Sequence, residues 1–89
     1  MIKIIKAETS GQAQLRLTVS DGTQGDYDFA SLLGTDTVLT RPLNNPEYFN
    51  THFLELGALC WRNGLELSPA ALYSELQSGN KLTRAQQAA

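Results

Sequence analysis

The sequence predicts an α+β fold in which a small antiparallel sheet packs against a short helix and a C-terminal helix. Three observations predict it: apolar residues alternate over residues 14–19, an Asp-Gly turn signal follows at residues 21–22, and a Ser-Pro helix start stands at residues 68–69. Eighty-nine residues suffice for one modest core. We therefore expect a single α+β domain over residues 1–79 and a flexible C-terminal tail over residues 80–89.

The N-terminal third predicts a three-stranded meander. Residues 2–8 are rich in β-branched Ile, although adjacent Ile4 and Ile5 break strict alternation and so allow either a bulge or burial on both sides. In residues 14–19 the Leu and Val side chains share one face, which is the period of a half-buried strand. After the Asp-Gly turn, residues 24–29 return as the partner strand, with aromatic side chains on one face and acidic side chains on the other.

The middle of the chain predicts two short helices. Residues 30–34 indicate one helical turn that ends at a Gly, and residues 45–49 begin with Asn-Pro, an N-cap followed by Pro at the first helical position. Between them we expect a short extended piece around Val38 and Leu39, which ends before Pro42 because Pro lacks a backbone donor.

The C-terminal part predicts a hairpin followed by a helix. Residues 52–56 and 58–62 are the expected arms of the hairpin, and an Asn-Gly pair stops the second arm. Ser68 is the expected N-cap of the helix, and Gly79 is its expected end. Between these two residues runs an apolar stripe of Leu72 and Leu76.

The composition disfavours several classes of function. Seven basic and nine acidic residues leave a formal charge of -2, which is too little positive charge to concentrate a nucleic acid. Weak DNA binding would require the scattered basic residues to converge on one face, namely Lys3, Lys6, Arg16, Arg41 and Arg62. One Cys and one His form neither a disulfide nor a metal-ligand pattern, so we expect no metal and no cofactor. The charged N-terminus and the lack of a long apolar segment predict a cytoplasmic protein with no membrane contact.

Three polar residues are candidates for catalysis or small-ligand binding. Asp26 and Asp28 lie two apart on one predicted strand face, so both carboxylates could share a proton or hold a divalent cation. The competing interpretation is the solvated face of a half-exposed strand. His52 could act as a general base, but no nucleophile is tied to it by a recognised motif. An enzyme or ligand-binding hypothesis requires all three side chains to meet in one pocket.

Trp61, Arg62 and Tyr73 are the candidate interaction residues. Aromatic side chains contribute heavily both to cores and to interfaces. For Trp61 the core interpretation is favoured, because in a domain of this size one Trp supplies much of the available apolar area. Cys60, between Leu59 and Trp61, is interpreted as a small buried hydrophobic residue.

Three segments together resemble a small bacterial family, domain of unknown function 2442. They read LRLTVSDGTQGDYDFASLL, PLNNPEYF and LCWRNGLELSPAALY, and they occur in the family's order. The resemblance covers the chain from the N-terminal strand to about Leu76. It implies an α+β fold without established catalytic residues. It also implies a small neighbouring protein as partner, in a pair that resembles a toxin and its antitoxin.

These observations favour a non-catalytic protein-binding or regulatory module, with another small protein as the expected partner and an antitoxin-like role as one form of it. A meander leaves edge strands that can pair with another chain, so a homodimer through a sheet edge is also expected. The alternatives are an enzyme or small-ligand binder that uses Asp26, Asp28 and His52, and a weak DNA-binding regulator.

Overall fold

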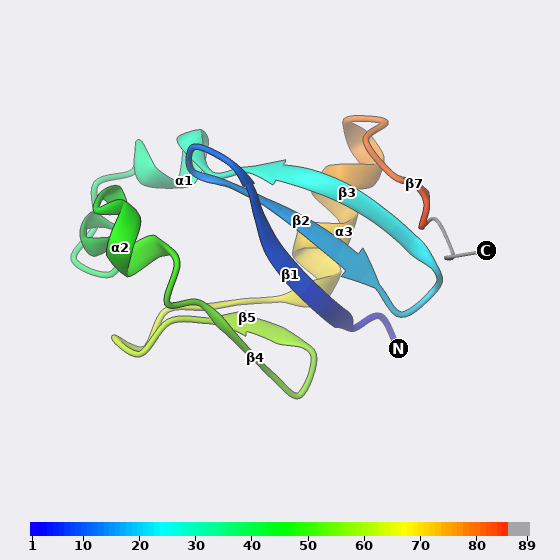
Figure 1. Ribbon diagram of the computed structural model, residues 1–89, viewed down its shortest axis with the longest axis horizontal. Helices are drawn as coiled ribbons and strands as arrows, with labels where there is room; N and C mark the ends of the chain where they lie inside the picture. The colour runs from blue at the N-terminus through cyan, green and yellow to red at the C-terminus, as the bar shows by residue number, and fades with distance from the viewer. Residues whose placement is uncertain (86–89) are drawn as a thin grey trace.

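Two antiparallel sheets and several short helices build the fold, which a computed structural model describes over residues 1–85 (Figure 1). The first sheet has the order β1-β2-β3-β7 and contains β1 (Ile4–Gly11), β2 (Gln14–Val19), β3 (Thr23–Asp28) and β7 (Thr83–Arg84). The second has the order β4-β5-β6 and contains β4 (Phe53–Glu55), β5 (Ala58–Cys60) and β6 (Glu66–Leu67). The helices are α1 (Ala30–Leu33), the 3₁₀ helix η1 (Arg41–Asn44), α2 (Pro46–Phe49) and α3 (Pro69–Ser78). The predicted α+β class is confirmed.

The first sheet has one buried face and one polar face. The alternating side chains of β2 are fully buried, while Arg16 on the opposite face lies across from Asp26 of β3. The register of β1 against β2 shifts between Ile4 and Lys6, so the bulge is confirmed: Ile4 is buried and Ile5 is exposed. The three-stranded meander is therefore present as predicted.

Helix α3 crosses the buried face of this sheet at Gly25. A Cβ atom at Gly25 would lie 2.9 Å from the Lys81 carbonyl oxygen and 3.3 Å from a methyl carbon of Leu76. The absence of a side chain therefore lets α3 and the segment after it lie close to β3.

An aromatic cluster joins the two sheets. The ring of Phe29, just after β3, lies 5.3 Å from that of Phe49 in α2 and 5.9 Å from that of Trp61, just after β5. Trp61 is 1% exposed, and its indole Nε1 donates to the Phe49 carbonyl at 3.0 Å. The interpretation of Trp61 as a core residue is confirmed.

Both predicted Pro-capped helices start where expected. The Asn45 side chain accepts from the Glu47 backbone amide at the start of α2, and Ser68 Oγ accepts from the Ala71 amide at the start of α3. The α3 helix ends at Ser78, with Gly79 as its C-cap. The residue that takes a positive φ is the next one, Asn80, at 55°.

The predicted extended piece around Val38 and Leu39 is wrong. Residues 37–40 form a turn that leads into η1. The hydroxyls of Thr37 and Thr40 each accept from the backbone amide of the other residue, at 3.1 and 2.9 Å, and this local pairing replaces a strand partner.

The structure also contains two short strands that the sequence does not predict. The Glu66–Leu67 strand pairs with β5, and Thr83 and Arg84 pair with Gln24 and Thr23 of β3. The segment 80–85 thus contains a strand where only a tail was expected, while residues 86–89 of that expected tail lie outside the described residues. Over the described chain, every helix is too short or too polar to cross a lipid bilayer.

Candidate functional site

The two aspartates predicted to share one face of β3 are each engaged locally. Arg16 Nε donates to Asp26 Oδ1 at 3.0 Å, and this hydrogen bond with the guanidinium charge lowers the pKa of Asp26. Asp28 Oδ1 accepts from the Ala30 backbone amide at 2.9 Å and so supports the start of α1. Both carboxylates therefore have structural partners.

His52 is half-buried and packs against the aromatic cluster. Its Nδ1 lies 3.2 Å from the Phe49 carbonyl oxygen and its Nε2 lies 3.3 Å from that of Ala7. Its ring centroid is 6.3 Å from that of Trp61. Both ring nitrogens therefore face backbone carbonyl oxygens, and a neutral imidazole can donate to only one of them.

Asp26 and His52 have different neighbours in the structure. Asp26 lies on the polar face of the first sheet with Arg16, whereas His52 packs against the buried Trp61. Within residues 1–85, no three His, Cys, Asp or Glu side chains gather in a way that could hold a metal ion. Cys60 is 6% exposed, and burial together with nearby Glu66 and Glu55 raises the pKa of its thiol, which disfavours the reactive thiolate.

Several basic side chains lie beside acidic side chains. Three of them form ion pairs: Lys6–Glu8 at 3.8 Å, Arg16–Asp26 at 3.0 Å and Arg41–Asp36 at 2.9 Å. Each carboxylate reduces the positive potential that a phosphate backbone would meet.

The three candidate interaction residues have different surroundings. Trp61 is buried and cannot contact a partner in this fold. Tyr73 is half-buried, and its hydroxyl donates to Asp21 Oδ2 at 2.8 Å, which raises the pKa of the phenol. Arg62 is exposed beside the Asn63-Gly64 turn.

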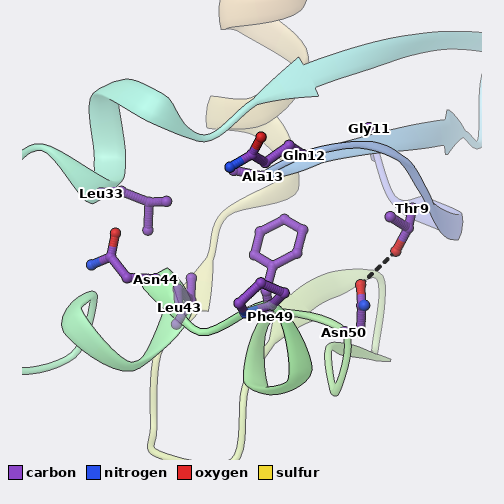
Figure 2. A pocket seen from close by; sticks show the side chains of 10 residues that line it. Thr9, Gly11, Gln12, Ala13, Leu33, Leu43, Asn44, Phe49 and Asn50 are labelled. Carbon is purple, nitrogen blue, oxygen red and sulfur yellow. Dashed lines mark hydrogen bonds between the residues drawn. The ribbon is translucent and has the colours of Figure 1, made fainter.

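A cleft of about 220 Å³ opens at the tip of the β1–β2 hairpin (Figure 2). Figure 2 shows Leu33 and Asn44 on one side, Thr9 and Asn50 on the other, and the ring of Phe49 between them. The Thr9 hydroxyl donates to Asn50 Oδ1 at 2.7 Å and ties the hairpin to the end of α2.

The lining of this cleft is uncharged throughout. Its apolar side chains are those of Ala13, Leu33, Leu43, Pro46 and Phe49. Its polar part consists of the side chains of Thr9, Gln12, Asn44 and Asn50. Amide side chains both donate and accept hydrogen bonds, so the cleft matches a neutral polar group next to an apolar one better than it matches an ion.

The outer edge of β1 contacts Gly57 at Ile4 and His52 at Ala7, and it reaches the cleft at Thr9. The Ala7 carbonyl points away from β2, because it faces His52 Nε2 at 3.3 Å. Backbone groups of an antiparallel strand alternate in direction from one residue to the next, and the register is regular from Ala7 to Thr9. The backbone N–H and C=O of Thr9 therefore also point away from β2. Ala13, also in the lining, has a φ of 51°, a strained value for a residue other than Gly.

A second groove, of about 290 Å³, lies between α1 and α3. Its walls include Leu32, Leu67 and Leu72. Its charged group, Glu75, accepts a hydrogen bond from the Tyr27 hydroxyl at 2.6 Å. Burial and this carboxylate raise the pKa of Tyr27 far above its ordinary value, so the phenol stays a donor to Glu75 rather than acting as a base.

Sequence reasoning missed the residues of the hairpin-tip cleft. Gln12 stands in a turn, and Asn44 and Asn50 flank the short α2 helix, so none of them belongs to a recognised motif. The available signal was the gathering of side-chain amides around residues 44–50. These amides indicate a site only in the folded chain, where Gln12 and Thr9 line the same cleft as Asn44 and Asn50.

The described fold contains each landmark of the family resemblance. The Ser-Asp-Gly segment forms the turn between β2 and β3, and Trp61 to Gly64 connect β5 to β6 ahead of α3. No curated protein and no solved structure matches the chain significantly. The sequence model of one family, described as protein of unknown function (DUF2442), matches residues 4–78. The chain therefore belongs to the DUF2442 family of proteins of unknown function.

Proposed function

We propose that the protein is a non-catalytic protein-binding module that holds an extended segment of a partner in the cleft at the hairpin tip. The observation that carries this proposal is the uncharged lining, in which apolar side chains lie beside amide and hydroxyl groups. A peptide offers the matching chemistry, an apolar side chain flanked by backbone amides. A volume of about 220 Å³ suits one or two side chains, since pockets for drug-sized ligands usually begin near 300 Å³.

The edge of β1 supports an extended conformation for the bound segment. The outward backbone groups of Thr9 lie beside the cleft and can pair with another strand. Strand pairing would supply affinity independent of sequence, and the apolar part of the cleft would select a bulky side chain.

The biological role we propose is regulatory, with another small protein as the partner, in an antitoxin-like pair of the kind that the family resemblance implies. This role is consistent with the local engagement of Asp26, Asp28 and His52 in structural hydrogen bonds. Capture of the partner from the native host by the tagged full chain would identify it. The same capture with Asn44→Arg, which places a long charged side chain at the cleft, should lose that partner.

A peptide titration tests the cleft itself. The probe is acetyl-Ala-Leu-Ala-amide, with acetyl-Ala-Ala-Ala-amide as the comparison, added to the isotope-labelled full chain. We expect nuclear magnetic resonance shifts at the backbone amides of residues 11–13, Leu33 and Asn50, and larger shifts with the leucine peptide. Asn44→Arg should abolish them, whereas Ser74→Arg, an exposed change on α3, should preserve them. Shifts that avoid these residues, or that persist in Asn44→Arg, would disprove the proposed cleft.

A further inference from the structure

The groove between α1 and α3, here called the helix groove, is lined on one side by a single face of α3 and its N-cap. The lining residues on this side stand at the spacing of neighbouring helical turns and are Ser68, Ala71, Leu72 and Glu75. Ser31 and Leu32 of α1 also line the groove, as does Tyr27 of β3. The walls therefore come from elements that are distant in the sequence.

The helix groove has an apolar end and a negatively charged end. Leu32, Leu67 and Leu72 line the apolar end, and Leu72 stands about one helical turn, roughly 5 Å, from Glu75. A smaller hollow of about 200 Å³ continues the groove at the charged end, because Glu75 and Tyr27 line both. A short alkyl chain can therefore reach from the leucines to the carboxylate.

Negative charge exceeds positive charge at the charged end. The smaller hollow is lined by Asp28 and Lys81 as well as Glu75, which gives two carboxylates and one ammonium group. Lys81 also lines a separate hollow with Asp26, so its positive charge is shared with a third carboxylate. Within residues 1–85, none of the ion pairs includes Glu75 or Asp28. The local charge therefore favours a cationic ligand.

Tyr27 fixes the position of the Glu75 carboxylate and leaves it able to bind a ligand. The Tyr27 hydroxyl donates to Oε2 at 2.6 Å. A carboxylate offers about four acceptor positions, so Glu75 can accept a further hydrogen bond from a charged donor. A group that is already held in place loses little conformational entropy when it binds.

We propose that the helix groove binds a small primary amine, whose ammonium group donates to Glu75 and whose short alkyl part lies against the three leucines. A neutral or anionic molecule would remove water from Glu75 without supplying a charge partner, which costs free energy. A volume of about 290 Å³ is close to the lower limit of small-molecule pockets and suits a short alkyl group. In the described chain, this groove and the hairpin-tip cleft share no lining residue, so the amine site goes beyond the proposed function.

A titration with isoamylamine tests the amine site. The probe is added at pH 7 to the isotope-labelled full chain, from about 1 to about 50 mM, the range expected for so small a ligand. We expect saturable nuclear magnetic resonance shifts at the backbone amides of Leu32, Ala71 and Leu72. Isoamyl alcohol has the same alkyl part without the charge, and methylamine has the charge without the alkyl part. Each should bind at least about tenfold more weakly than isoamylamine.

Two variants with the same change of charge separate the site from the rest of the surface. Glu75→Gln removes the charge but keeps an acceptor for Tyr27, and it should weaken isoamylamine binding about tenfold. Glu55→Gln, an exposed change in β4, should bind isoamylamine like the wild type. The far-ultraviolet circular dichroism spectra of both variants should match that of the wild type. The comparison of the three small molecules on the wild type does not depend on how either variant folds.

Several outcomes would overturn the amine site. These are the absence of saturable shifts with isoamylamine, equal binding of the alcohol or of methylamine, and wild-type binding by a folded Glu75→Gln chain. Tighter binding of Nα-acetyl-lysine amide than of isoamylamine would also overturn it, because the groove would then suit a basic side chain of a protein. The leucine-peptide titration reads the other cleft, so either proposal can fail while the other holds.

Discussion

Tyr27 couples the first sheet to α3 through a single hydrogen bond. Its ring lies opposite Leu15 in the sheet, and its hydroxyl donates to Glu75 Oε2 at 2.6 Å. Burial of the phenol, followed by the bond to this carboxylate and its charge, raises the pKa of Tyr27. The neutral phenol is the form that can donate, so this contact depends on the protonated state.

The Tyr27 contact predicts a loss of stability in alkaline solution. In the unfolded chain a Tyr ionises near pH 10, whereas the folded protein retains the proton to higher pH. The contribution of Tyr27 is therefore complete below about pH 10 and is lost as the pH rises through that value toward the folded pKa. We expect Tyr27→Phe to lower the free energy of unfolding by about 1 kcal/mol at pH 7. The difference from wild type should shrink above about pH 10.

Urea unfolding at several pH values measures this effect. Tyr73→Phe is the comparison, because it removes a phenol–carboxylate hydrogen bond from Asp21 at the surface instead. A wild type and a Tyr27→Phe variant whose stabilities run parallel from pH 7 to about pH 11 would contradict the prediction.

At the scale of elements, α3 ends in a compact C-terminal motif. The Asn80 amide donates to the Gln77 carbonyl at 3.0 Å, and the Lys81 amide donates to the Leu76 carbonyl at 2.9 Å. This pair of bonds is the Schellman pattern, which needs a residue with positive φ just after the C-cap. Gly79 ends the helix, but Asn80 supplies that conformation, with a φ of 55°. The motif directs the chain toward β7.

A substitution series at Asn80 tests this helix end. Asn80→Ala should lower the free energy of unfolding by about 1 kcal/mol, because an ordinary side chain is strained at positive φ. Asn80→Gly should stay within about 0.5 kcal/mol of wild type, since Gly adopts this φ freely. Urea unfolding gives both values, and Gln77→Ala, an exposed change in the same helix, is the control. Equal effects of Ala and Gly at residue 80 would exclude strain as the cause.

At the scale of the whole molecule, the aromatic cluster joins the two sheets into one core. Phe29 follows the last strand of the meander, Phe49 belongs to α2, and Trp61 follows β5. All three side chains are buried. Neither sheet can therefore separate from the other without exposing this cluster to water.

Unfolding should consequently be a single transition. Trp61 is the only Trp in the chain, so its fluorescence reports on the contact between the sheets. We expect the urea midpoints from Trp61 fluorescence and from far-ultraviolet circular dichroism to coincide, as in a two-state transition. A fluorescence change at clearly lower urea than the loss of secondary structure would indicate that the second sheet detaches first.

The sequence by itself determined the elements whose signals lie within a few residues. The alternation in β2, the Asp-Gly turn and the Asn-Pro and Ser-Pro helix starts are confirmed, because each reflects local backbone geometry or a cap bond between near neighbours. The family landmarks were identified from the same segments. The burial of Trp61 was also predictable, since a small core needs its largest apolar side chain.

Only the tertiary structure decided which distant residues meet. The sequence allowed Asp26, Asp28 and His52 to form one polar site. In the structure Asp26 accepts from Arg16 and Asp28 accepts from the Ala30 amide. His52 faces the Ala7 carbonyl. The pairing of β7 with β3 depends on the path of the chain after α3. The cleft joins Thr9 and Gln12 to residues 33–50, which have no local reason to meet. Contacts across such separations follow from packing of the whole core, and no short pattern encodes them.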